Sequence, residues 1–100
     1  MIYVKKHESE RGEVIAMCDE ELIGRVIEEK GRTLDLKAHS KFYKGELLTE
    51  EQAGDELEGS VYSANIVGER AVSIVIGRGL ASEEQVMCIG KVRMLQIFTV

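Results

Sequence analysis

The chain has 100 residues, of which 44% are hydrophobic and 31% charged, and a net charge of −5 at pH 7. This length predicts one domain over residues 1–100 with a core of its own, and the composition excludes a disordered chain. The acidic balance argues against non-specific binding to DNA, and no run approaches the roughly 18 apolar residues of a membrane span. With two cysteines and no secretory signal, we expect a cytoplasmic protein with no membrane partner.

The N-terminal part of the chain predicts a hairpin followed by a short helical turn. Residues 2–7 alternate apolar and polar side chains, and residues 13–18 are largely apolar, so the glycine-containing stretch between them predicts a turn. Asp19 is expected to cap a helical turn that Gly24 ends.

Several short elements are expected next. Residues 33–36 predict a strand, whereas VIEEK at 26–30 is ambiguous. SKFYKGELL at 40–48 predicts a turn with an aromatic anchor.

A short helix is predicted after TEEQ at residues 49–52, which matches a capping box. We expect it to run from Glu50 to about Leu57, weakened by Gly54 and ended by Gly59.

The stretch GERAVSIVIGRG at 68–79 follows a predicted strand at 61–67 and fits two structures. Its apolar residues alternate as in a strand, yet they also form one face of a helix. We favour the helix, because Glu69 and Arg78 suit the two ends of its dipole.

The C-terminal part predicts a second capping box, SEEQ at 82–85, and then a hairpin. Gly90 and Lys91 are expected to form its turn, and residues 92–100 its final strand, placed centrally in the sheet. Together these elements predict an α+β fold: a mainly antiparallel sheet with two short helices on one face and β-hairpins at both ends.

No arrangement typical of catalysis or metal binding stands out. Two cysteines and two histidines could form a zinc site only if distant positions converged, because none has ligand spacing. Buried thiols are the simpler interpretation of Cys18 and Cys88, and solvated capping residues that of the many paired carboxylates. We therefore expect no catalytic residue, no metal site and no cofactor.

Two stretches could bind a ligand. Gly68 precedes a predicted helix whose free N–H groups could hold a phosphate, with Arg70 and Asn65 beside it, although no glycine-rich phosphate motif is present. Tyr43 lies between Lys41 and Lys44, which is the interleaving of aromatic and cationic side chains that suits stacking on unpaired bases.

Three stretches, CDEELIGR, FYKGELLTEEQA and ANIVGERAV, occur in this order before a β-rich C-terminus. With them the chain resembles the DUF424 family of small archaeal proteins of unknown function. The resemblance implies an archaeal, cytosolic, single-domain α+β protein, and supplies no activity; the family's wide presence in archaea would suit a process such as translation. The motif residues map onto Asp19, Glu20, Gly24, Arg25, Phe42, Tyr43, Gly45, Asn65, Gly68, Glu69 and Arg70.

The leading hypothesis is a non-enzymatic binding module for a protein or RNA assembly. Its candidate surface combines the turn at 18–25, the corner at 42–45 and the start of the long helix, with the residues Arg25, Tyr43, Lys44, Asn65, Gly68 and Arg70. The alternative is a small enzyme or ligand binder with a phosphate at the Gly68 helix N-terminus. A structural protein that assembles through a free sheet edge is a third possibility.

Overall fold

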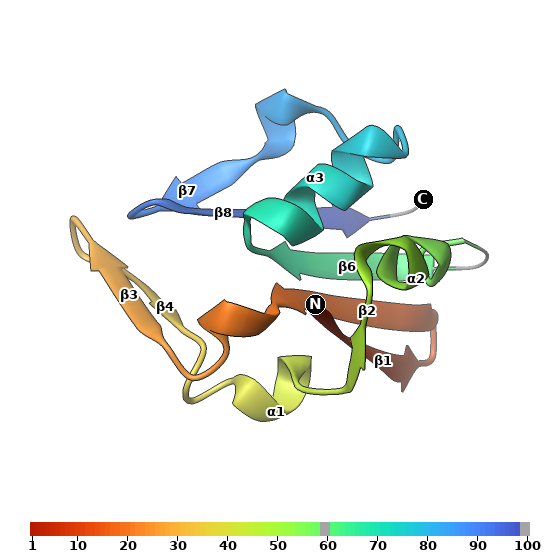
Figure 1. Cartoon of the computed structure of the whole chain (residues 1–100), viewed down its shortest axis with the longest axis horizontal. Coiled ribbons are helices and arrows are strands. Elements are labelled where there is room, and N and C mark those ends of the chain that lie inside the picture. The colour runs from red at the N-terminus through yellow and green to blue at the C-terminus, as the bar shows by residue number, and fades with distance from the viewer. Residues whose placement is uncertain (59–60, 99–100) are drawn as a thin grey trace.

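The main sheet of the computed structural model, which describes residues 1–58 and 61–98, has six strands in the order β5-β1-β2-β6-β8-β7 (Figure 1). Their bounds are β1 Ile2–Ser9, β2 Gly12–Asp19, β5 Glu46–Leu48, β6 Val61–Val67, β7 Met87–Ile89 and β8 Val92–Phe98. Neighbouring strands are antiparallel except β2 and β6, which run parallel. The mainly antiparallel α+β fold expected from the sequence is confirmed.

Both predicted hairpins are present. In the first, Ser9 of β1 pairs with Gly12 of β2, and in the second Ile89 of β7 pairs with Val92 of β8 around the turn of Gly90 and Lys91. Strand β8 lies between β6 and β7, inside the sheet as predicted. Residues 99–100 of the expected final strand lie outside the described residues.

A second, two-stranded sheet projects from the main one and resolves the ambiguous stretch at 26–30. It pairs β3 (Val26–Glu29) with β4 (Arg32–Asp35), so the strand predicted at 33–36 begins and ends one residue earlier. Lys30 and Gly31 form its turn with φ of 50° and 80°. A two-residue turn with both φ positive matches the twist of the flanking strands.

The helical elements are η1 Glu20–Leu22, α1 Ser40–Tyr43, α2 Glu50–Asp55, α3 Glu69–Gly77 and η2 Glu83–Gln85. Helix α2 begins with the predicted capping box: Gln52 N–H donates to Thr49 Oγ1, and Thr49 N–H donates to Gln52 Oε1, both at 3.1 Å. It ends at Asp55, short of Leu57, and the expected stop at Gly59 lies outside the described residues. The helical interpretation of 68–79 is confirmed by α3, and the predicted second capping box starts η2.

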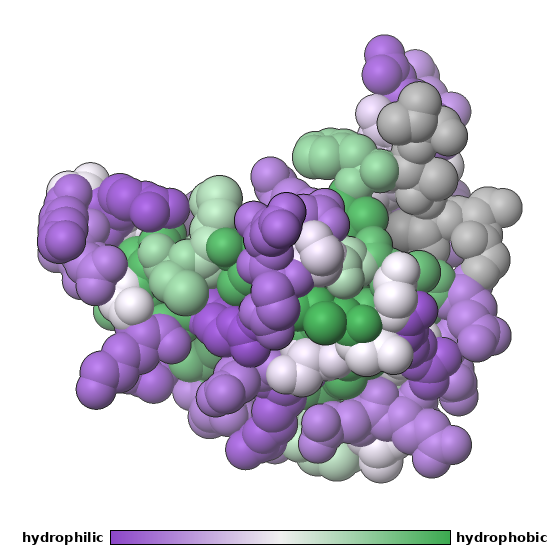
Figure 2. Space-filling model, turned by 90° about the horizontal axis from the view of Figure 1, so that it is seen from above, coloured by the Kyte–Doolittle hydropathy of each residue, from purple (hydrophilic) through white to green (hydrophobic). Residues whose placement is uncertain are grey.

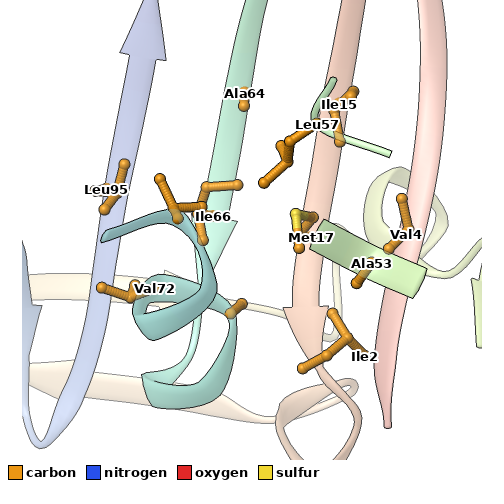
Figure 3. Close-up of a cluster of buried hydrophobic side chains, with 12 residues drawn as sticks. Ile2, Val4, Ile15, Met17, Ala53, Leu57, Ala64, Ile66, Val72 and Leu95 are labelled. Atoms are coloured by element: carbon orange, nitrogen blue, oxygen red, sulfur yellow. The ribbon is translucent and has the colours of Figure 1, made fainter. Parts of the chain in front are cut away.

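Helices α2 and α3 cover one face of the main sheet, as predicted, and enclose the larger core (Figure 3). Its buried side chains include Ile2, Val4, Ile15, Met17, Ala53, Leu57, Ala64, Ile66, Val72 and Leu95. We call this the helix face. The β3–β4 hairpin and α1 cover part of the opposite face, which we call the hairpin face; the sequence did not predict this second layer. The smaller core beneath it comprises Ala16, Cys18, Leu22, Leu34, Leu36, Tyr43, Val67 and Ile89.

Candidate recognition surface on the hairpin face

The part of the hairpin face that the β3–β4 hairpin and α1 leave open carries a row of polar side chains. In the register of the sheet, Lys5 of β1 lies opposite Ala16 of β2, which lies opposite Asn65 of β6. Asn65 in turn lies opposite Gln96 of β8. Because directly opposed residues point to the same face, this register places Asn65 and Gln96 side by side on the hairpin face.

Asn65 and Gln96 are joined by a hydrogen bond, in which Gln96 Nε2 donates to Asn65 Oδ1 at 2.6 Å. The bond leaves the Asn65 amide N–H groups and the Gln96 carbonyl oxygen available on the exposed side. Turning both amides over would exchange these roles and still leave one donor and one acceptor. The pair therefore offers a ligand one donor beside one acceptor.

A hollow of about 410 Å³ lies over this pair. Its lining includes Tyr43, Asn65, Met87, Gln96 and Phe98. The Phe98 side chain is 62% exposed and Met87 51% exposed, so large apolar side chains flank the amides. A second hollow, of about 320 Å³, shares Tyr43 and Asn65 with the first and extends along α1 past His39 and Phe42.

Helix α1, which borders both hollows, is held against β1 by contacts of its aromatic residues and of its backbone. The His7 and Phe42 rings are stacked with centroids 4.4 Å apart, and His7 Nε2 lies 2.9 Å from the Phe42 carbonyl oxygen. Tyr43 meets Phe42 edge-on and is only 9% exposed; burial raises its pKa above 10.0. Lys5 Nζ donates to the Lys41 carbonyl oxygen at 2.7 Å. The predicted aromatic anchor is confirmed, with Tyr43 as its buried member.

The segment that contains α1 is also the basic part of the molecule. Residues 36–44 include three lysines, Lys37, Lys41 and Lys44, and no carboxylate. Of the net charge of −5 they contribute +3, so the rest of the chain carries −8. Within the described residues, no ion pair involves these lysines, whereas Lys6, Arg70, Arg78 and Arg93 are all paired with carboxylates.

Gly68 and Asp19 meet at the N-terminus of α3, where the sequence suggested a phosphate site. The Asp19 carboxylate, 3% exposed, accepts hydrogen bonds from the Arg70 N–H at 3.1 Å and the Ala71 N–H at 2.9 Å. Gly68 is buried against it with φ of +111°. The donors assigned to a phosphate in the alternative hypothesis are thus already occupied by a carboxylate of the same chain.

The role predicted for Asp19 is corrected by the same contacts. Asp19 precedes η1, yet its side chain makes no capping hydrogen bond to that turn and caps α3 instead. Burial raises the pKa of Asp19 above 3.8, while the hydrogen bonds from Arg70 and Ala71 act in the opposite direction. The carboxylate is a structural cap, since one buried residue ties the end of β2 to the start of α3.

The remaining predicted site residues lie apart from the open sheet face. Arg70 pairs with Glu21 through Nη2 and Oε1 at 3.3 Å. Arg25 borders a separate hollow beside Glu21 and Lys91, and Lys44 is exposed directly after α1. The structure therefore brings Tyr43 and Asn65 into one hollow, with Lys44 on the adjoining segment, and places Arg25, Gly68 and Arg70 around Asp19.

Two residues of the hollow, Gln96 and Phe98, were not singled out from the sequence. The signal was available in β8, where Val92, Met94, Gln96 and Phe98 recur at every second position and so share a face. A single glutamine in an otherwise apolar run marks the point where that face becomes exposed. The strand was interpreted as apolar on both faces, which concealed this alternation.

The cysteines and histidines do not converge. Among the described residues, no group of three or more His, Cys, Asp or Glu side chains is arranged to hold a metal ion. Cys18 is buried, and burial raises the pKa of its thiol to about 12; Cys88 is exposed on β7. No helix in the described part of the chain is long and apolar enough to cross a membrane. The side that bears α3 and β7 shows hydrophobic patches interspersed with hydrophilic side chains (Figure 2).

These features define a small single-sheet α+β protein with an open, amide-bearing sheet face. The model of DUF424, described as a protein of unknown function, matches residues 7–100, and the chain belongs to this family. A crystal structure of an uncharacterized conserved protein from Methanopyrus kandleri is similar, with a TM-score of 0.80 and 30% identity over 97% of this chain and 90% of that one. No curated protein matches the chain.

Proposed function

We propose that this protein is a binding module for single-stranded RNA, which it engages through α1 and the adjoining open part of the hairpin face. The observation that carries the proposal is the segregation of charge: residues 36–44 hold +3 with no carboxylate, in a chain whose other residues carry −8. A local basic segment on an acidic protein attracts a polyanion to one place and repels it elsewhere.

The surroundings of the basic segment favour RNA over an acidic peptide. The hollows beside α1 are lined mainly by aromatic, apolar and amide side chains, which contact bases well. Lys41 and Lys44 flank Phe42 and Tyr43, so cations that can contact phosphates lie next to surfaces that can contact bases. An acidic peptide would need cations inside the hollow, and the larger hollow is lined by none.

Affinity for labelled single-stranded RNA of about ten nucleotides, measured by fluorescence anisotropy at several salt concentrations, tests the proposal. We expect the double variant Lys41→Glu/Lys44→Glu to bind more weakly. The slope of log K against log salt should fall by about 1.4, because each lost contact to a single strand removes about 0.7. Arg11→Glu, an exposed charge reversal in the β1–β2 turn, is the matched control and should leave the slope unchanged.

The same variants can be used to capture partners from an archaeal lysate with and without ribonuclease. Recovery of RNA by the wild type and by Arg11→Glu, but not by the double variant, supports the proposal. A partner protein retained after ribonuclease treatment, without binding of the purified protein to RNA, would show a protein-binding module instead. Equal RNA affinity and salt slope in all three proteins would contradict the role of α1.

A further inference from the structure

We propose that the open part of the hairpin face is a binding site for one unpaired nucleobase, which stacks on the Phe98 ring and hydrogen-bonds to the Asn65–Gln96 pair. This inference rests on the proposed RNA binding and specifies where a base would be recognised. It assigns a role to the most exposed large apolar side chain of the described residues and to an amide pair that no other part of the fold uses.

The stacking surface and the amides lie at the distance that a base requires. Phe98 and Gln96 are two residues apart on β8, so both side chains point to the hairpin face, about 7 Å apart along the strand. Both line the hollow of about 410 Å³. A base lying against the Phe98 ring would thus present its edge toward Gln96 and Asn65.

The hydrogen-bonding pattern of the pair suits a nucleobase edge. With Gln96 Nε2 engaged by Asn65 Oδ1, the pair offers the Asn65 N–H groups as donors and the Gln96 carbonyl as acceptor. Each nucleobase has an edge on which a donor and an acceptor are neighbours, as N6 and N7 are in adenine. The internal hydrogen bond holds the two amides in place before the ligand arrives, which lowers the entropic cost of binding.

The charge next to the hollow favours a nucleotide over an uncharged peptide. Tyr43 forms the border of the hollow toward α1, and Lys41 and Lys44 flank this residue in the sequence. A base in the hollow would leave its phosphates on the side of these lysines, which have no carboxylate partner among the described ion pairs. A peptide backbone could satisfy the amides but would gain nothing from the lysines.

A short RNA that carries one 2-aminopurine among uridines tests the site, because the fluorescence of this base falls when it stacks. We expect quenching by the wild type, and its loss in Phe98→Ala with an affinity about five- to hundredfold lower, as for one stacked base. Gln96→Ala should keep the quenching and reduce the preference among A, U and C homopolymers. Leu80→Ala, which removes another exposed apolar side chain beyond α3, is the matched control.

An abasic strand of the same length separates this inference from the proposed function. Weak, salt-dependent binding of the abasic strand that Phe98→Ala does not alter is the expected result. If all variants bind the normal and abasic strands equally well, the base site is refuted while RNA binding through α1 stands. If the wild type binds neither strand, both proposals fail. Unfolding curves of Phe98→Ala and Gln96→Ala should match the wild type, since both side chains are exposed.

Discussion

At the scale of single residues, Asp19 and Gly68 are the contact on which the junction between β2, β6 and α3 depends. Gly68 has φ of +111°, and a Cβ added to it would overlap the Asp19 carboxyl group. The glycine therefore allows the carboxylate to reach the N–H groups of Arg70 and Ala71. This close approach explains the glycine better than a ligand does.

Gly68→Ala should lower the free energy of unfolding by about 2–4 kcal/mol, because the new methyl group would both force a strained φ and displace the buried cap. Gly77→Ala is the matched control, since Gly77 is exposed at the end of α3 and a Cβ there meets nothing within 4 Å. It should be neutral or stabilise by up to about 1 kcal/mol. Urea denaturation measures both, and equal effects would contradict the role of the close contact.

The pH dependence of stability follows from the raised pKa of Asp19. Burial raises this pKa in the folded protein above 3.8, so the folded state binds a proton more tightly than the unfolded state. The stability that this proton contributes is complete below the unfolded pKa and is lost as pH rises through the folded pKa. We expect the unfolding free energy of the wild type, relative to Asp19→Asn, to be greater near pH 3 than near pH 7. An increase of this difference with pH would contradict the direction of the shift.

At the scale of elements, strongly patterned segments were predictable and weakly patterned ones were not. The capping box before α2, the strands β1 and β6, and the helix α3 each carry a local signal that the fold preserves. Strands β3 and β4 form an isolated pair whose side chains are mostly exposed, so their pattern of burial is too weak to reveal alternation. The partner of Asp19 could not be found locally either, because 51 residues separate it from Arg70.

The turn of the β3–β4 hairpin contains the one non-glycine residue of positive φ among the described residues, Lys30 at 50°. Lys30→Asn should raise the free energy of unfolding by about 0.5–1 kcal/mol, because asparagine tolerates this conformation and Asn-Gly is the favoured sequence for such a turn. Lys91→Asn removes the same charge at the turn between β7 and β8, where φ is not positive. A gain in the control equal to that in Lys30→Asn would point to charge instead of backbone strain.

At the scale of the whole molecule, the long connection from β2 to the parallel β6 divides into parts with different roles. It contains η1, the β3–β4 hairpin, α1, β5 and α2, which together reach both faces and one edge of the sheet. The candidate site depends on this division: its amides come from β6 and β8, while its cations come from α1. The sequence revealed Tyr43 and Asn65 individually, but only the register of β6 and β8 brings Asn65 to Gln96.

If this division is correct, the β3–β4 hairpin can be removed without loss of RNA binding. Backbone hydrogen bonds already close its base: the Leu36 N–H donates to the Arg25 carbonyl at 2.8 Å, and the Gly24 N–H donates to the Leu36 carbonyl at 3.0 Å. Replacing residues 26–34 with Asn-Gly would leave a three-residue loop with Asp35, whose carboxylate accepts from the N–H groups of Lys37 and Ala38.

The shortened protein should lose about 2–4 kcal/mol of stability, because Leu34 and Ile27 no longer cover the smaller core. Its affinity for RNA should stay within about twofold of the wild type, since residues 26–34 hold equal numbers of basic and acidic residues and the α1 lysines remain. Circular dichroism and anisotropy titration measure the two quantities on the same sample. A folded variant that no longer binds RNA would transfer the recognition surface from α1 and the open sheet to the hairpin.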